Sequence, residues 1–205
     1  MRIGIIVATD FELGEARKII DNIKEEEHFN LVFVSGILSK KEVVLVKSGM
    51  GKVNSARTAQ ILIDKFNVDK VINIGAAGAL NPNLNVNDIV IGDKLVQYDF
   101  DVSTLDDVER GEIQGIGKYI KSDTSLVNVC SAAIDNMEDK QFSVKVGTIA
   151  TADLFCTDAN IAKNIREEFG AECVEMEGAA VAQVCFLDNI PFLVIRGISD
   201  TPNRK

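Results

Sequence analysis

Short apolar runs rich in valine and isoleucine recur along the chain, and longer stretches with apolar residues at every third or fourth position lie between several of them. The short runs predict strands and the longer stretches predict helices. The candidate strands are Ile3–Ala8, Leu31–Leu38, Val43–Lys47, Lys70–Ile74, Ile89–Val96, Val144–Thr151, Cys173–Met176 and Phe192–Arg196. The candidate helices are Phe11–Lys24, Val53–Phe66, Ser125–Met137, Asp158–Phe169 and Gly178–Leu187. This order predicts an α/β protein with a largely buried central sheet.

The chain carries enough apolar residues for one sizeable core. Of its 205 residues, 46% are hydrophobic, which suits a single domain. Neither a repeat nor a linker rich in Pro, Gly or Ser interrupts it, so we expect one domain over residues 1–205. The segment Tyr98–Lys121 differs in composition from the rest of the chain, because it contains several glycines and acidic residues and few apolar residues. It predicts a long surface loop that covers a pocket or meets a partner subunit.

The charge and hydropathy of the chain disfavour several partners. A formal net charge of −9 would repel nucleic acid, and no basic patch offsets it. The acids Glu25–Glu27 are interpreted as the solvated end of a helix. No stretch approaches the roughly 20 apolar residues of a membrane span. The opening residues Met1–Val7 run directly into a strand without a secretory layout. The sequence therefore predicts a soluble cytoplasmic protein without nucleic-acid or membrane partners.

The cysteines do not indicate a metal site. Cys130, Cys156, Cys173 and Cys185 form no C-x-x-C pair, and only His28 could join them as an imidazole ligand. They are interpreted as reduced residues that mostly serve packing, without a metal or a disulfide.

Two glycine clusters follow candidate strands, at Ser48–Lys52 and at Gly75–Gly78. Both would let a ligand approach the backbone closely. Neither matches the G-x-G-x-x-G dinucleotide fingerprint or the G-x-x-x-x-G-K-[ST] phosphate loop. Taken alone, each cluster predicts a tight turn, and no cofactor is expected.

Charged residues stand in otherwise apolar sequence at two places near the end of the chain, Val174–Glu177 and Arg196–Asp200. Such charges need a partner, a ligand or a reaction to offset their desolvation. In an extended segment Glu175 and Glu177 would face the same side, and Arg196 could pair with either acid. A buried ion-pair network is one interpretation. A catalytic pair is the interpretation favoured here.

A further acid, Glu12, follows the first candidate strand. It could simply lie in the first turn of a helix capped by Thr9 or Asp10, where its charge suits the helix dipole. Its position favours a second interpretation, because ligands of α/β proteins gather beyond the carboxyl ends of strands. The residues that fall just past candidate strands are Glu12, Gly49, Gly78, Glu177 and Asp200.

Taken together and in order, Ile3–Glu12, Ser48–Val53, Val174–Glu177 and Arg196-x-x-Ser199-Asp200 resemble the 5′-methylthioadenosine/S-adenosylhomocysteine nucleosidases of the purine nucleoside phosphorylase superfamily. The resemblance covers almost the whole chain. It implies a three-layer α/β/α sandwich with a central mixed sheet. It also implies a homodimer that uses water, without a cofactor, to hydrolyse the N-glycosidic bond of 5′-methylthioadenosine and S-adenosylhomocysteine, releasing adenine and a thioribose.

The resemblance also implies roles for single residues. Asp200 matches the general acid that protonates nitrogen-7 of the purine, which requires a carboxyl with a raised pKa. Glu12 matches the base that deprotonates the attacking water, so the two acids need opposite protonation states. Glu177 matches the acceptor of the ribose hydroxyls, and Met176 the side chain packed on the sugar.

The remaining matches surround the substrate. Phe155 corresponds to the residue that stacks on adenine, Cys156 to one that holds it through backbone groups, and Arg196 to one near the water and Glu12. Gly78 corresponds to a backbone position near the substrate. The other residues expected to line the binding site are Met50, Ala76, Val174, Glu175 and Ser199.

The sequence departs from the family pattern at three places. Ala76 stands where a serine is common, and the missing hydroxyl is expected to cost on the order of 1 kcal/mol. Gln114 stands where a proline is common, in a loop that resembles the segment reaching a partner's 5′-thio pocket. The family pattern continues past Ser199-Asp200 into a long helix, whereas the sequence ends at Lys205. For these 205 residues we expect lower stability or activity than for a relative with that helix.

Two other functions remain as alternatives. A phosphorolytic enzyme would use phosphate in place of water, but it needs arginines around the anion, and Glu12 would repel it. A catalytically idle nucleoside-binding or storage relative would agree with Ala76 and the short end. Retention of Glu12, Glu177 and Asp200 argues against that alternative, since a binding protein needs no acid–base pair.

Overall fold

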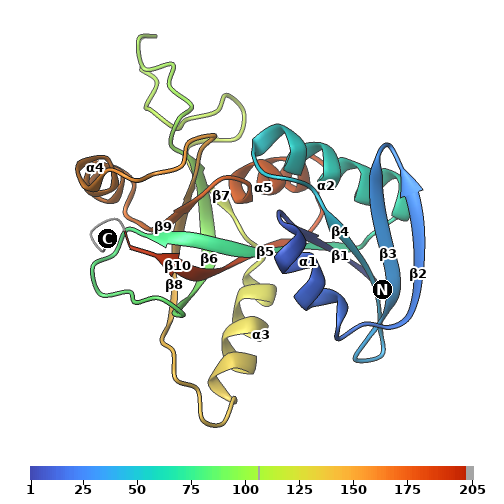
Figure 1. Ribbon diagram of the computed structural model, residues 1–205. Coiled ribbons are helices and arrows are strands. Elements are labelled where there is room, and N and C mark those ends of the chain that lie inside the picture. Colours follow the sequence, from blue (N-terminus) through green and yellow to red (C-terminus); the bar gives the residue numbers. More distant parts are fainter. Residues whose placement is uncertain (106, 202–205) are drawn as a thin grey trace.

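A mixed β-sheet of ten strands runs through residues 1–105 and 107–201, the part of the chain that this computed structural model describes (Figure 1). The strands are β1 (Arg2–Val7), β2 (Asp21–His28), β3 (Leu31–Leu38), β4 (Lys41–Lys47), β5 (Lys70–Ala79), β6 (Ile89–Gln97), β7 (Ile120–Lys121), β8 (Val144–Thr151), β9 (Ala171–Glu175) and β10 (Phe192–Asp200). The helices are α1 (Asp10–Arg17), α2 (Lys52–Phe66), α3 (Thr124–Asp135), α4 (Ala159–Phe169) and α5 (Gly178–Leu187).

Strand β5 joins the two parts of the sheet. The strand order is β10-β6-β8-β9-β5-β1-β4-β3-β2, and an additional pairing of β10 with β5 closes five strands into a ring. The strands β1, β4, β3 and β2 continue from β5 as an open extension. Because β1 and β10 both run parallel to β5, and β4 runs parallel to β1, the carboxyl ends of these four strands lie at one edge. The candidate site residues come together at that edge.

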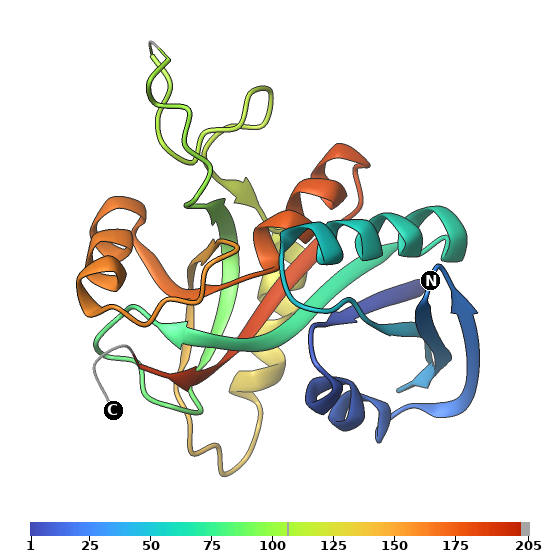
Figure 2. The same cartoon turned by 45° about the horizontal axis from the view of Figure 1, so that its top comes forward.

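Helices cover both faces of the sheet. Helices α2 and α5 lie side by side over one face, whereas α1 and α3 lie on the other (Figure 2). The main core fills the space between the sheet and the α2–α5 pair, with fully buried side chains that include Ile6, Leu62, Val71, Leu95 and Val181. The expected three-layer α/β/α sandwich with a central mixed sheet is therefore confirmed.

The first predicted helix is wrong beyond Arg17. Residues Asp21–His28 form β2, an exposed edge strand that pairs antiparallel with β3. The acids Glu25–Glu27 are thus solvated, but they lie on a strand and not at a helix end. Glutamate favours helices in isolation, yet pairing with β3 overrides that preference. Charges along an edge strand also disfavour pairing with another chain.

The glycine cluster at Gly75–Gly78 is not a tight turn, because β5 continues through it to Ala79. Strand β10 likewise extends beyond the predicted end at Arg196 and pairs with this stretch as far as Asp200. A Cβ on Gly75 would lie 3.1 Å from Glu12 Oε1, so the missing side chain makes room for that carboxylate. The predicted turn after β4 is confirmed, with Gly49 and Gly51 at φ angles of 82° and 96°.

Tyr98–Lys121 forms the predicted loop in its described residues, apart from the short strand β7 at its end; residue 106 lies outside the described part. Residues 202–205 also lie outside the described part, and with them the end of the sequence, where we expect the departure from the family's C-terminal helix. Among the described helices, none has the length and apolar character that crossing a membrane requires.

All four cysteines are free thiols. Cys173 and Cys185 are completely buried in the main core, and burial raises the pKa of the Cys185 thiol to about 12. These two cysteines therefore act as packing residues.

Candidate active site

A cavity of about 160 Å³ opens at the strand edge where β1, β4, β5 and β10 end. It is lined by the predicted residues Glu12, Met50, Ala76, Gly78, Phe155, Cys156, Val174, Glu175, Met176, Glu177, Ser199 and Asp200. Four more residues line it that the sequence did not single out for the site: Ala8, Thr9, Ala77 and Leu154. Ala77 and Leu154 adjoin predicted residues in the sequence, and Ala8 and Thr9 donate backbone hydrogen bonds to Glu12 at the start of α1. Arg196 alone of the predicted set lies behind the cavity wall.

Glu12 is held by the start of α1. Its Oε2 accepts the backbone N–H groups of Ala8 at 2.8 Å and Thr9 at 3.0 Å, while the Thr9 hydroxyl accepts the N–H of Glu12. This reciprocal pair is a capping box. The other oxygen, Oε1, accepts the N–H of Ala76 at 3.1 Å. The Glu12 carboxylate therefore serves two purposes, because it caps the start of α1 and also lines the cavity.

Glu177 is fixed from a different direction. Its Oε1 accepts the N–H of Gly51, at the beginning of α2, at 2.9 Å. The Ser55 hydroxyl donates to its backbone carbonyl. The residue is only 6% exposed, so its carboxylate is largely withdrawn from water although it lines the cavity. A carboxylate in this position can accept hydrogen bonds from a ligand's hydroxyl groups.

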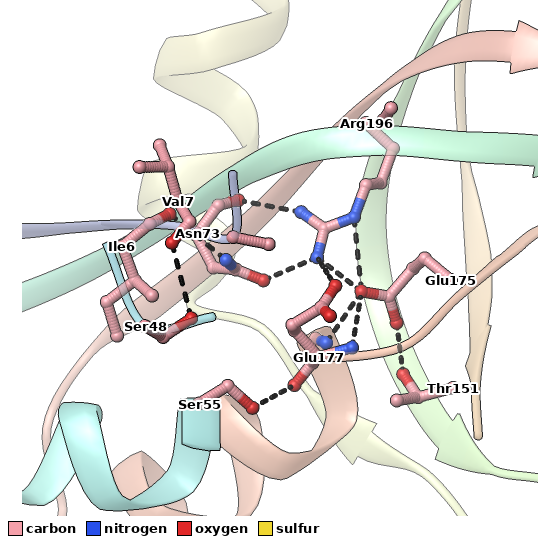
Figure 3. Close-up of polar contacts among 12 residues, drawn as sticks. Ile6, Val7, Ser48, Ser55, Asn73, Thr151, Glu175, Glu177 and Arg196 are labelled. Carbon is pink, nitrogen blue, oxygen red and sulfur yellow. Dashed lines mark hydrogen bonds and ion pairs between the residues drawn. The ribbon is translucent and has the colours of Figure 1, made fainter. Parts of the chain in front are cut away.

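Glu175, which lines the cavity, forms a buried ion pair with Arg196 (Figure 3). Glu175 Oε2 accepts both Nε and Nη2 of Arg196, and also the backbone N–H groups of Glu177 and Gly178. Thr151 donates its hydroxyl to the second oxygen of Glu175. The guanidinium also donates to the carbonyl and side-chain oxygens of Asn73. The ion-pair interpretation of the acidic cluster is therefore correct for Glu175, whereas Glu177 lines the cavity and its catalytic role stays a prediction.

The negative charge of Glu177 is costly at this buried position. Burial raises the pKa of Glu177 to about 6, and the neighbouring carboxylate of Glu175 adds to the increase. The N–H of Gly51 and the guanidinium of Arg196, 4.0 Å away, act in the opposite direction. The cavity therefore holds an acid that is more readily protonated than an exposed glutamate.

The raised pKa of Glu177 predicts a pH-dependent gain in stability for Glu177→Gln. An acid whose pKa is higher in the folded state contributes stability below its unfolded pKa of 4.5, and this contribution is lost as pH rises through about 6. The variant stays neutral, so we expect it to match the parent near pH 4 and to exceed it by about 2 kcal/mol above pH 7. Urea unfolding curves from pH 4 to 8 measure the difference.

The control is Glu167→Gln, which removes an exposed carboxylate from α4. We expect its free energy of unfolding to stay within about 0.5 kcal/mol of the parent at every pH. Curves for Glu177→Gln that run parallel to the parent would contradict the prediction.

Asp200 is the last residue of β10. The Ser199 hydroxyl donates to its Oδ1 at 2.7 Å. Its Oδ2 lies close to the backbone of Gly78, where an added Cβ would come within 3.3 Å. The pairing with β5 shifts register between Ile198 and Asp200, which is a β-bulge. Bulges commonly redirect a side chain next to an active site.

The outer wall of the cavity is apolar and exposed. Phe155 is 73% exposed and Leu154 61%, in the loop between β8 and α4. Met50, on the turn before α2, is also exposed and lines the cavity. An aromatic ring with a free face can stack on a planar base.

The sequence profile of the Phosphorylase superfamily matches residues 2–205. Similar proteins include the 5′-methylthioadenosine/S-adenosylhomocysteine nucleosidases of Bacillus licheniformis, 40% identical, and of Bacillus subtilis, 37% identical; each alignment covers 100% of this chain and 88% of the relative. Among solved structures, the nucleosidase of Colwellia psychrerythraea with adenine has a TM-score of 0.93 and 35% identity, covering 98% of this chain and 83% of that one. The Neisseria meningitidis nucleosidase with methylthio-immucillin-A has a TM-score of 0.92 and 33% identity, covering 97% and 85%.

The chain, with its sheet closed through β5 and an acidic cavity at the strand edge, therefore belongs to the phosphorylase superfamily. Within that superfamily, the chain is a member of the 5′-methylthioadenosine/S-adenosylhomocysteine nucleosidase family.

Proposed function

We propose that this protein hydrolyses the N-glycosidic bond of 5′-methylthioadenosine and S-adenosylhomocysteine, releasing adenine and the thioribose. One observation carries the proposal: Glu12, Glu177 and Asp200 arrive from α1, the β9–α5 junction and β10 and line one cavity. Each has different hydrogen-bond partners. Surroundings that differ in this way can give neighbouring carboxyl groups separate roles.

In the proposed reaction, Asp200 donates a proton to nitrogen-7 of the purine while the electrons of the glycosidic bond pass to the base. The Ser199 hydroxyl donates a hydrogen bond to Oδ1 of Asp200, so in this proposal Oδ2 is the oxygen that carries the proton. Water attacks the anomeric carbon and gives its proton to Glu12. The three backbone N–H donors around Glu12 fix the orientation of its carboxylate for this step.

Glu177 serves the sugar in this proposal. Its Oε1 is held by the N–H of Gly51, and the carboxylate accepts the ribose hydroxyls. Its negative charge also favours the positive charge that develops on the sugar in the transition state. Phe155 stacks on adenine, and Met176 packs on the ribose. Arg196 keeps Glu175 and the N–H groups of the β9–α5 junction in place and does not touch the substrate.

Hydrolysis is favoured over phosphorolysis by the charges around the cavity. Among the described residues that line it, none is a lysine or an arginine, whereas four are acids. A phosphate dianion would find repulsion there and no bidentate partner. Water carries no charge and meets no such barrier.

The test is adenine release from the two nucleosides, measured with and without phosphate. We expect release in phosphate-free buffer at an unchanged rate. A strict need for phosphate would contradict hydrolysis. Tight binding of adenine without any turnover would support the idle nucleoside-binding alternative instead.

We further propose a cytoplasmic homodimer of single-domain subunits, paired through the outer face of α2 and α5. Val53 is 78% exposed on α2, and Phe186 and Leu187 are exposed on α5. A second cavity, of about 260 Å³, lies between these helices. Exposed apolar surface of this kind marks protein interfaces. Sedimentation equilibrium tests the proposal, and a monomer at micromolar concentration would contradict it.

A further inference from the structure

The beginning of α2 forms hydrogen bonds to two segments that contribute to the cavity wall, one at Glu177 and one at the loop that begins with Asp153. The N-cap residue of α2, Gly51, makes no side-chain cap hydrogen bond. Instead, the N–H of Gly51 donates to Glu177 Oε1 at 2.9 Å and the N–H of Lys52 donates to Asp153 Oδ1 at 2.8 Å. Two carboxylates from distant parts of the chain thus replace the missing cap, where the helix dipole favours negative charge.

Asp153 is tied down a second time. Its own N–H donates to Asp99 Oδ2 at 3.1 Å, and Asp99 Oδ1 accepts the Lys52 ammonium group at 2.7 Å. Lys52, Asp99 and Asp153 therefore form a closed ring of hydrogen bonds. The ring joins the start of α2, the segment after β6 and the loop after β8.

The loop after β8 needs such an anchor. Leu154 and Phe155 follow Asp153 directly, line the cavity, and are mostly exposed, so little packing holds them. Asp153 itself does not line the cavity. Gly51 leaves room for the contact, since an added Cβ there would lie 2.9 Å from Asp153 Oδ1.

We propose that Asp153 is a positioning residue that holds the base-binding wall, Leu154–Cys156, at a fixed distance from the sugar-binding Glu177 through their shared anchor on α2. The inference rests on the proposed nucleosidase activity for its kinetic consequence. Because the wall contacts the base before and during the reaction, loosening it weakens binding in both states. The defect is therefore expected in KM and not in kcat.

For Asp153→Ala, we expect KM for 5′-methylthioadenosine and the dissociation constant for adenine to rise by about tenfold or more, with kcat within about threefold of the parent. Asp153→Asn keeps an oxygen that can accept the Lys52 N–H, so its KM should stay within about threefold of the parent. Hydrogen exchange of residues 152–157 in the ligand-free protein should become faster in the alanine variant only.

The matched control is Asp123→Ala. Asp123 caps α3 with the same kind of hydrogen bond, from the Leu126 N–H at 2.8 Å, but it is not among the residues that line the cavity. It should lose comparable stability without a change in KM. An unchanged KM and adenine affinity in Asp153→Ala would overturn the proposal, as would an equal KM rise in Asp123→Ala or in Asp153→Asn. If the parent releases no adenine, the proposed function fails, while adenine affinity and hydrogen exchange still decide the role of Asp153.

Discussion

Replacing Asp200 with asparagine is expected to lower kcat for adenine release by about 10²- to 10⁴-fold, the usual range for loss of a general acid. Asparagine has nearly the same shape, and its side-chain oxygen can still accept the Ser199 hydroxyl that Asp200 Oδ1 accepts at 2.7 Å. It has no acidic proton to give to the purine. Binding of a non-hydrolysable nucleoside analogue should therefore change little, and single-turnover kinetics with calorimetry measure both quantities.

A substrate with a better leaving group separates acid catalysis from misfolding. A 4-nitrophenyl 5-thioriboside releases 4-nitrophenolate, which departs without protonation, so Asp200→Asn should cleave this substrate at nearly the parent rate. The matched control is Ser199→Ala, which removes the hydroxyl that contacts Asp200 Oδ1 and the Ala77 carbonyl and should cost tenfold or less, about 1 kcal/mol. An asparagine variant that keeps more than a tenth of the parent's kcat on the nucleoside would show that Asp200 is not the acid.

Replacing Arg196 with methionine is expected to lower the free energy of unfolding by about 3–5 kcal/mol, because it leaves the buried carboxylate of Glu175 without its counter-ion. Arg196 is only 1% exposed, and its guanidinium is the partner of both Glu175 and Asn73. Methionine fills much of the volume but supplies none of these hydrogen bonds. Urea unfolding followed by circular dichroism measures the loss.

Two further variants show where the loss comes from. Arg17→Met breaks an ion pair with Glu25 that is exposed on both sides, so it should cost no more than about 1 kcal/mol. The double change Glu175→Gln with Arg196→Met should cost less than the sum of the single changes, because both break the same pair. Strict additivity, or a loss in Arg196→Met as small as in Arg17→Met, would contradict the role assigned to the buried pair.

Much of the fold follows from apolar periodicity, because most strands are buried on both faces and read as continuous runs. Apolar periodicity does not predict the structure where residues are not buried. Strand β2 is a charged, exposed edge strand without an apolar pattern, so the sequence indicated a helix there. The periodicity also fails at Gly75–Ala79 and Gly197–Asp200, where small or polar residues continue β5 and β10. Their strand conformation comes from pairing with each other, which only the folded chain provides.

For the site, position in the sequence was enough to place Glu12, Gly78, Glu177 and Asp200 at one strand edge, whereas most other lining residues were expected only from the family resemblance. Position could not decide which acid Arg196 pairs with, since Glu175 and Glu177 are two residues apart and equally charged. The choice depends on the turn into α5, whose N–H groups point at Glu175. The role inferred for Asp153 was also beyond reach, because its partners Lys52 and Asp99 are distant in the sequence.

The bulge in β10 has a consequence for how this stretch of chain can vary. It places one extra residue between Ile198 and Asp200 relative to β5, after Arg196 has already been set opposite Gly75. The number of residues between the guanidinium and the acid therefore determines on which side of the strand the acid emerges. Substitutions at Ile198 or Ser199 alter packing or the contacts of one hydroxyl group, whereas a single inserted or deleted residue there would turn Asp200 away from the cavity.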